Sequence, residues 1–374
     1  MRSGKEHYPG SSASFYSAQS LIKRIRRLLK QYSGSCTGPF CPLSKCVLVS
    51  ITLSSPLLSC GDGVTDPPGS IDDTDYSIEL VFITHGTPSQ DEAFIAAADR
   101  WMDILQGDLS NVDFSSNPVP ANTCGQGAQH PEVSDTVDDL RIFIDIRPLD
   151  GPSGTLAQAG FCQIRSLSRL PVLGFMSFDV ADLGQIEQSG DLTALTLHEM
   201  GHVLGVGTLW PEFDVLLVDP SLPFNSGADT HFAGGAAIAA FDAAGGTAYT
   251  GGEKVPVENL LGEGSADTHW RESVLRNELM TPALQSGVAN PLSAITTESL
   301  VDLGYTVDSS AADSFTGAFS ASARLADSFT GTSSAPARMT ASAGRIIDLE
   351  NDTYRGPVQV VDHSGYVTRT IPRR

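Results

Sequence analysis

The sequence from Asp191 to Gly205, DLTALTLHEMGHVLG, decides the fold. Its apolar residues recur at helical spacing, and Asp191 is of a type that caps helix N-termini, so the stretch predicts a helix. His198 and His202 are four residues apart and therefore project from one helix face, about 6 Å from each other. Zinc fits such a pair, since its bonds to histidine nitrogens are about 2.0–2.1 Å long. With Glu199 between them, within reach of a metal-held water, the three residues predict a catalytic metal site.

A catalytic zinc ion needs a third protein ligand and keeps a fourth position open for water. Two downstream histidines, His231 and His269, compete for the third place, because each lies in the same Ala-Asp-Thr-His context. A glutamate could serve instead, and the glutamates considered are Glu212, Glu253, Glu258 and Glu278. The residues alone leave these alternatives open.

Further motifs favour one of these candidates for the third ligand. The run from His198 to Gly205 is similar to the motif of the metzincin zinc endopeptidases, in which the final glycine lets the chain leave the helix in a left-handed conformation. Most metzincins have their third histidine ten residues after the first, where this chain has Thr208. The sequences GSADTHW at 264–270 and NELMTP at 277–282 resemble the leishmanolysin family, whose third histidine comes from far downstream, just before a methionine-containing turn.

The resemblance to the leishmanolysin family covers about residues 76–307 and implies a zinc-dependent endopeptidase that cleaves proteins or peptides. It implies that His198, His202 and His269 bind one catalytic zinc ion. Glu199 is then the general base, and Met280 is the methionine of the Met-turn. The implied fold is α+β and metzincin-like. We expect a twisted mixed sheet with two packed helices in the N-terminal subdomain, and an irregular C-terminal subdomain with the Met-turn and a terminal helix.

The chain departs from the parasite members of that family, which carry a long inhibitory pro-segment with a cysteine that blocks the zinc. Only residues 61–75 separate Cys60 from the first predicted strand, which puts control by such a pro-segment in doubt. The alternative function is a cell-surface adhesion or binding protein that retains a structural zinc site. The intact Glu199 argues against it, because a structural site needs no base and usually has four protein ligands.

Hydrophobic patterns before the motif predict a sheet with helices packed on it. Alternating apolar residues predict strands at 76–84 and 172–178, and a half-buried strand at 140–147. The sequence Ser-Gln-Asp-Glu at 89–92 is typical of a capping box and predicts the start of a helix, which Gly107 ends.

The first 60 residues predict export. Val47 to Leu58 form a mostly apolar run that is typical of a signal sequence and too short to cross a bilayer, which needs about 20 residues. Cys60 follows in the sequence LLSCG, which resembles the lipobox of bacterial lipoproteins, where the cysteine carries the lipid. A cleaved secretory signal is the alternative. In either case we expect an extracytoplasmic protein, lipid-anchored to the cell envelope or secreted.

Charge and cysteine usage bear on the partners. The net charge of −21 repels phosphate backbones, so nucleic acid is not an expected partner. We expect a monomer that contacts the membrane only through a lipid on Cys60. With three cysteines upstream of Cys60, Cys124 and Cys162 remain, and in an oxidising compartment they predict a disulfide. Two buried free thiols are the alternative.

These observations divide the chain into six parts. The sequence ADSFTG occurs at 312–317 and again at 326–331, in a Ser-, Ala- and Thr-rich stretch typical of a linker. Apolar runs at 358–361 and 366–371 predict a small hairpin, which two strands alone stabilise only marginally. The expected parts are a leader region 1–60, a tether 61–75, an N-terminal catalytic subdomain 76–205, a C-terminal catalytic subdomain 206–308 with the third ligand and the Met-turn, a repeat linker 309–345 and a C-terminal tail 346–374.

Overall fold

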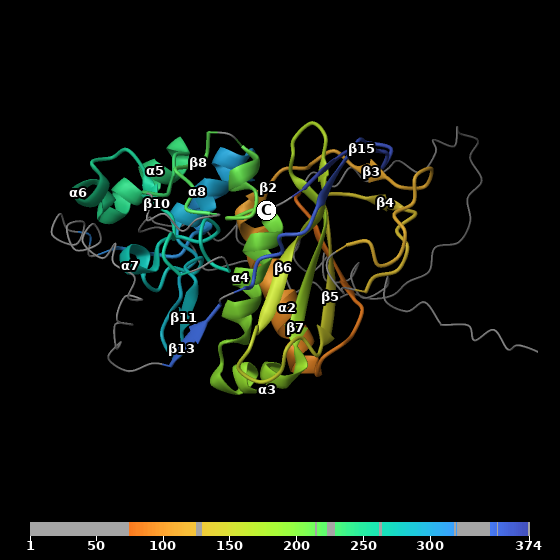
Figure 1. Ribbon diagram of the computed structural model, residues 1–374, viewed down its shortest axis with the longest axis horizontal. Coiled ribbons are helices and arrows are strands. Elements are labelled where there is room, and N and C mark those ends of the chain that lie inside the picture. Colours follow the sequence, from red (N-terminus) through yellow and green to blue (C-terminus); the bar gives the residue numbers. More distant parts are fainter. Residues whose placement is uncertain are drawn as a thin grey trace, which may run out of the picture. The chain divides into compact units, whose positions relative to one another are not determined.

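Six strands form the main sheet of the computed structural model, in the order β1-β5-β7-β6-β14-β15 (Figure 1). The strands β1, β5 and β7 are parallel to one another, β6 is antiparallel to β7, β14 is parallel to β6, and β15 is antiparallel to β14. Their bounds are β1 Ile78–Phe82, β5 Leu140–Arg147, β7 Pro171–Asp179, β6 Ala157–Arg165, β14 Val358–Val361 and β15 Val367–Ile371. The predicted twisted mixed sheet of an α+β fold is therefore present.

The structure describes residues 75–124, 129–213, 215–222, 229–261, 264–317, 319, 345–349 and 351–372. The expected leader with Cys60, the tether up to residue 74 and the second copy of the repeat lie outside these residues. The described residues all fall within one compact unit, Ser70–Arg374. Among them, no helix has the length and apolar character needed to cross a membrane.

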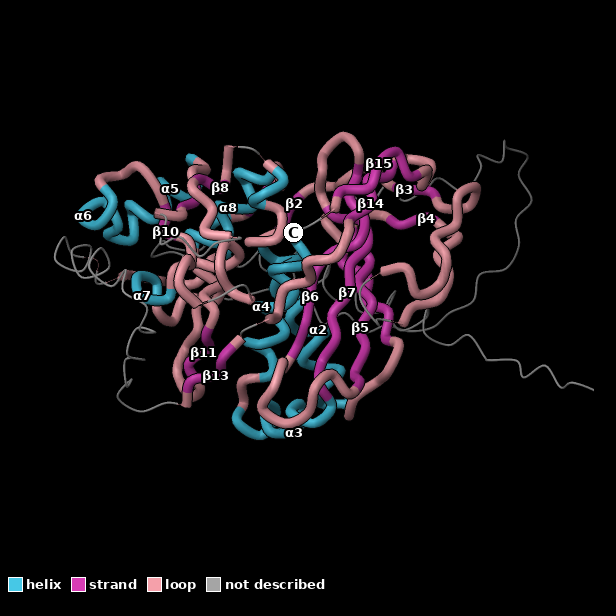
Figure 2. The backbone as a smooth tube through the Cα atoms, in the orientation of Figure 1, coloured by secondary structure: helices cyan, strands magenta, loops and turns pink. Residues whose placement is uncertain are grey.

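Helices cover one face of the main sheet. The helix α4, Leu192–Leu204, packs on β6 and β7, and α2, Pro88–Ile104, packs on α4 and β1. Figure 2 shows both helices on one side of the strands, with the short strands β3 and β4 on the other. A third helix, α3, Val180–Ser189, connects β7 to α4 and ends at Gly190. The helices α2 and α4 are the two packed helices expected for this part of the chain.

Two predicted caps differ from the structure. The helix α2 begins at Pro88 with Thr87 as its N-cap, and Thr87 forms a capping box with Gln90 rather than Ser89 with Glu92. Proline at the first helical position fixes this start, because its backbone angle suits a helix and it needs no amide partner there. At the start of α4, Asp191 holds the N-cap position without a side-chain cap bond, and its carboxylate accepts from Ser286 Oγ at 2.6 Å.

The opposite face of the sheet is also covered, so the prediction that the strand at 140–147 is half-buried was wrong. The described residues of the loop from Val112 to Val137 pack there, and they include β3 Val112–Asp113 and β4 Thr136–Val137. Its apolar side chains contact Phe143 and Phe175, and Arg141 reaches Asp135 at 2.8 Å within the same layer. A strand buried on both faces is the pattern of parallel sheets covered by two layers.

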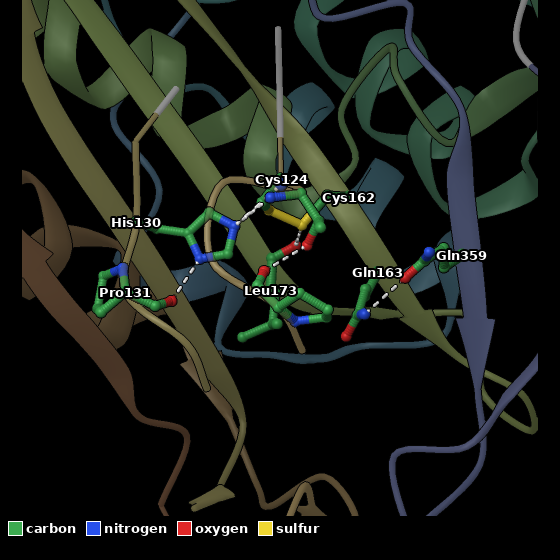
Figure 3. Close-up of a disulfide and its surroundings, with 9 residues drawn as sticks. Cys124, His130, Pro131, Cys162, Gln163, Leu173 and Gln359 are labelled. Carbon is green, nitrogen blue, oxygen red and sulfur yellow. Dashed lines mark hydrogen bonds between the residues drawn. A yellow bond between two sulfur atoms is a disulfide. The ribbon is translucent and has the colours of Figure 1, made fainter. Parts of the chain in front are cut away.

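A disulfide fastens this loop to the sheet. Cys124 in the loop is bonded to Cys162 in β6, 38 residues further along the chain (Figure 3). Both cysteines are buried among the apolar side chains that join the loop to the sheet. His130 accepts the backbone N–H of Cys124 at 3.0 Å and stacks on Phe143.

Replacing both Cys124 and Cys162 with serine is expected to lower the free energy of unfolding by about 2–4 kcal/mol, because the crosslink restricts the unfolded chain. Urea denaturation under non-reducing conditions measures the difference. The unaltered chain in excess dithiothreitol should unfold at the same urea concentration as the double variant. Equal stability of the oxidised chain and the double variant would contradict this contribution.

The C-terminal subdomain is built of short elements around one longer helix. The helix α8, Ala294–Leu303, is capped by Ser293 and ended by Gly304, and Tyr305 after it donates to the carbonyl of Leu204 at 2.9 Å. The strand pair β2 with β12 joins the two halves. The remaining bounds are β2 Leu105–Gln106, η1 Trp210–Glu212, β8 Leu217–Val218, β9 His231–Phe232, α5 Gly235–Phe241, η2 Asp242–Gly246, α6 Thr247–Thr250, β10 Val255–Pro256, α7 Glu272–Leu275, β11 Ala283–Gln285, β12 Thr306–Val307 and η3 Ser309–Ala311.

The tail does not stand apart from the main sheet. The strand β13, Ile346–Asp348, pairs with β11, and the hairpin of β14 and β15 extends the main sheet beyond β6. In Figure 1 the blue tail passes from β13 across α4 and β6. The first copy of the repeat also belongs to the folded unit, because Asp313 accepts from Arg100 at 2.9 Å. A hairpin that is marginal alone is stabilised by joining a larger sheet.

Candidate metal centre

The helix α4 carries two of the predicted ligands on one buried face. His198 and His202 are both 0% exposed, and their Nε2 atoms are 3.0 Å apart. The helix ends where the sequence predicts, because Gly205 has φ 115° and its N–H reaches the carbonyls of Gly201 and His202. The chain thereby turns away immediately after the second histidine.

A loop of the C-terminal subdomain brings His269 to these two. Its Nε2 lies 3.3 Å from that of His198 and 3.1 Å from that of His202. Backbone hydrogen bonds hold the loop, since His269 O accepts from Glu258 N at 2.9 Å and Trp270 N donates to Met280 O at 3.0 Å. The separation of 67 residues from His202 is thus closed by pairing within the subdomain.

All three imidazoles are oriented by backbone carbonyls. The Nδ1 atom of His198 lies 2.6 Å from Leu279 O, that of His202 lies 2.9 Å from Val206 O, and that of His269 lies 3.0 Å from Ser265 O. A carbonyl accepts only, so each Nδ1 carries the proton and each Nε2 presents a lone pair. Burial also lowers the pKa of His198 and of His202, which favours neutral rings. Three lone pairs converging at such distances fit a bound cation.

A fourth atom completes the cluster, and the sequence analysis missed it. The Oδ2 atom of Asp352 lies 3.1 Å from His198 Nε2, 3.6 Å from His202 Nε2 and 3.0 Å from His269 Nε2. In a tetrahedral zinc site with bonds of about 2.0 Å, ligand atoms are about 3.3 Å apart. The four atoms therefore have the size and shape of a tetrahedral site that could hold a metal ion. Nothing in the sequence marked Asp352, which lies in the tail without a spaced partner.

Glu199 is buried beside this cluster without a partner. Its side chain is 0% exposed, and neither carboxylate oxygen has a hydrogen bond among the described residues. Burial, together with the negative charge of Asp352, raises the pKa of Glu199 well above its usual value. A buried carboxyl group with no protein partner is costly unless a ligand or water binds it.

Met280 lies under the helix that carries the histidines. It is buried, and a Cβ added at Gly201 would come within 2.7 Å of its sulfur. The turn is held by Glu278, which accepts from Met280 N at 2.7 Å and from Thr296 Oγ1 at 2.6 Å on α8. The same turn supplies the carbonyl that orients His198, so it links α8 to the histidine cluster.

The other candidate ligands are not in the cluster. Among the described residues, the group of donor atoms around His198 and His202 contains only His269 and Asp352 in addition. His231 lies on β9, with its Nδ1 2.6 Å from Asp229 O. The candidate glutamates absent from the group are Glu212, Glu253, Glu258 and Glu278.

Replacing Gly207 with alanine is expected to weaken metal binding, because Gly207 has φ 74° and an added Cβ would overlap the backbone of Thr268, next to His269. Isothermal titration with Zn²⁺ measures the loss. Gly190→Ala is the matched control, since Gly190 has φ 82° but nothing within 4 Å of an added Cβ. This control should lower the free energy of unfolding by roughly 1–2 kcal/mol, the cost of a left-handed alanine, and should leave zinc affinity unchanged. Equal zinc affinity in the two variants would show that this contact does not position His269.

A family model described as leishmanolysin matches residues 114–331, more than half of the chain. The match includes α4, His269 and Met280, and ends before Asp352. A search of the curated proteins finds no match.

Proposed function

The chain belongs to the leishmanolysin family of metallopeptidases, and from this premise we propose that it is a zinc-dependent endopeptidase whose general base is Glu199. The observation that carries the proposal is the convergence of three deprotonated imidazole nitrogens beside a buried carboxyl group without a protein partner. His198, His202 and His269 would hold one ion. Histidine nitrogens in a tetrahedral arrangement favour zinc among the common metals.

A bound zinc ion supplies a Lewis acid that polarises the scissile carbonyl and makes a water molecule acidic near neutral pH. Glu199 then does the proton transfer, because it lies next to His198 on α4 and has both oxygens free to accept. It takes a proton from the attacking water and passes it to the departing amine. No serine or cysteine nucleophile is needed for this route.

Burial of Glu199 suits this role. Burial raises the pKa of Glu199, and a carboxylate with a raised pKa is a stronger base toward the attacking water. The carbonyls on the three Nδ1 atoms keep the rings fixed while the proton moves. Met280 acts as a positioning residue, since the turn that contains it contacts α4 and provides the carbonyl for His198.

The second candidate is a binding protein with a structural zinc site, and Asp352 is the observation that favours it. Four protein ligands are typical of structural zinc sites, whereas catalytic sites have three. Glu199 favours the peptidase, because a structural site gives no reason to bury a carboxyl group without a partner.

Hydrolysis of casein tests the choice between these functions. We expect cleavage that 1,10-phenanthroline stops and added Zn²⁺ restores. Cleavage that the chelator does not affect would contradict the proposal of a zinc peptidase. So would the absence of cleavage by both the unaltered chain and the variants Asp352→Asn and Tyr354→Ala.

We also retain a proposal on location. This acidic protein is held at the cell envelope by a lipid on Cys60, or it is secreted after cleavage of its signal. It acts as a monomer on protein or peptide substrates. Metabolic labelling with a radioactive fatty acid distinguishes the two locations, since Cys60→Ser should remove the label only from a lipoprotein.

A further inference from the structure

The metal-binding cluster is closed to any substrate in this structure. His198, His202, His269 and Glu199 are each 0% exposed, and Asp352 is 1% exposed. A peptidase must bring the scissile carbonyl of a peptide to the metal, so a part of the chain has to move away first. Asp352 belongs to that part, because it stands at the position that a catalytic zinc site leaves open.

Residues 351–355, which we term the closing segment, lie between β13 and β14 and run along the edge of β6. The N–H of Ala159 donates to Asp352 O at 2.7 Å, and Tyr354 N donates to Ala159 O at 2.8 Å. The Tyr354 ring lies edge-on against Phe175, with centroids 5.0 Å apart. The closing segment therefore makes a single parallel bridge to β6, at Ala159 and Thr353, beside the metal site.

Such an edge is also the place where an extended peptide can bind. Exposed strand edges bind peptides through backbone hydrogen bonds, which do not depend on the peptide's sequence. Both backbone groups of Ala159 are taken by the closing segment, so a substrate on this edge would compete with it directly. The segment blocks the metal with a side chain and the neighbouring edge with its backbone.

We propose, on the basis of the proposed function, that the closing segment keeps this peptidase latent, with Asp352 as a displaceable fourth metal ligand and with its backbone in the place of an extended substrate. Activation is the release of this segment. The Asp352 carboxylate leaves the fourth position, which is then open to water and to the substrate carbonyl.

The contacts of Asp352 suit a displaceable ligand better than a permanent one. Its Oδ2 faces the three imidazoles, whereas Oδ1 is buried without a hydrogen bond among the described residues, as is Oγ1 of the adjacent Thr353. A ligand of a permanent site is normally hydrogen-bonded on its second oxygen as well. The carboxylate is thus held mainly by the metal position itself and by the backbone at Ala159.

The central experiment compares the full-length, zinc-loaded chain with its Asp352→Asn variant, since asparagine keeps the shape but is a poor zinc ligand. Casein hydrolysis should rise about tenfold or more, which corresponds to an open fraction of about one tenth or less in the unaltered chain. Zinc content should remain at one ion per chain. Asp348→Asn is the matched control, because it removes a carboxylate from β13, on the same tail but outside the cluster, and should leave hydrolysis unchanged.

A spectroscopic readout separates the inference from the proposed function. With Co²⁺ in place of zinc, loss of the Asp352 carboxylate should change the visible absorption of the ion, whatever the enzyme does to casein. Unchanged absorption and unchanged chelator-sensitive hydrolysis would overturn the latency and leave the peptidase standing. Changed absorption with no hydrolysis by either form would show a structural site, and would overturn both.

A second variant decides the matter if Asp352→Asn fails to fold or to hold zinc. Tyr354→Ala loosens the closing segment from Phe175 and leaves all four donor atoms in place. It should also raise casein hydrolysis, whereas Tyr366→Ala, at a side chain that is 60% exposed further along the tail, should not. Hydrolysis by Tyr354→Ala at the level of the unaltered chain would overturn the proposal.

Discussion

Replacing Glu199 with glutamine is expected to lower kcat/KM for casein hydrolysis by about 10²- to 10⁴-fold, the usual contribution of a general base. Zinc content should not change, because Glu199 does not belong to the group of donor atoms. Glutamine has nearly the same shape, and no protein partner of the carboxylate is lost. The loss therefore reports on proton transfer rather than on packing.

Glu92→Gln is the control for this variant, since it removes the same charge from an exposed position on α2. Both variants are best measured alone and in the Asp352→Asn background, where the site is open and a large decrease can be resolved. The unfolding temperature of each variant shows whether it is folded. Hydrolysis by Glu199→Gln within a few fold of its parent, in either background, would contradict the role of general base.

Replacing His269 with alanine is expected to abolish both zinc binding and hydrolysis. Loss of an outer partner of a ligand typically costs 10- to 100-fold in metal affinity, and loss of a ligand should exceed that. The variant should also unfold at a lower temperature in the presence of zinc. An ion at 1,000 times its dissociation constant stabilises a protein by about 4 kcal/mol, and the variant forfeits this contribution.

His231→Ala provides the matched control, because His231 lies in the same Ala-Asp-Thr-His context but outside the group of donor atoms, with its Nδ1 2.6 Å from Asp229 O. It should retain one zinc ion and full activity. Isothermal titration with Zn²⁺ and elemental analysis compare the two proteins. Full zinc occupancy in His269→Ala, combined with loss in His231→Ala, would overturn the ligand assignment.

The sequence contained most of the information about α4, because a helix with two histidines on one face fixes their geometry locally. The family resemblance then favoured His269 over His231, a choice that spacing alone did not permit. Asp352 carried no comparable signal. A single aspartate in a polar tail becomes informative only when the tail is seen to pair with β6 and β11, and such long-range pairing leaves no local pattern.

The fold was harder to predict where a second layer covers the sheet. The strand β6 was not predicted, because Gly160 and two glutamines interrupt its apolar residues. The charges of β5 indicated a solvent-facing side, yet Arg141 is buried under the loop that contains Cys124, with Asp135 as its partner. The alternation of apolar and charged residues within one strand does not show that a segment distant in the sequence will cover a charged side chain and pair with it.

The pairing of β14 with β6 has a consequence for biosynthesis. The side chain of Gln359 on β14 accepts from that of Gln163 on β6, 196 residues earlier in the chain, at 2.8 Å. Contacts between such distant residues form slowly, because a long loop has to close first. The turn at Met280 is held by α8, so the three histidines can assemble once Leu303 is in place, before the tail has left the ribosome. Zinc is therefore expected to enter an open pocket in the nascent protein and to be sealed in by the last strands, so that a chain that folds completely without the ion should take it up slowly.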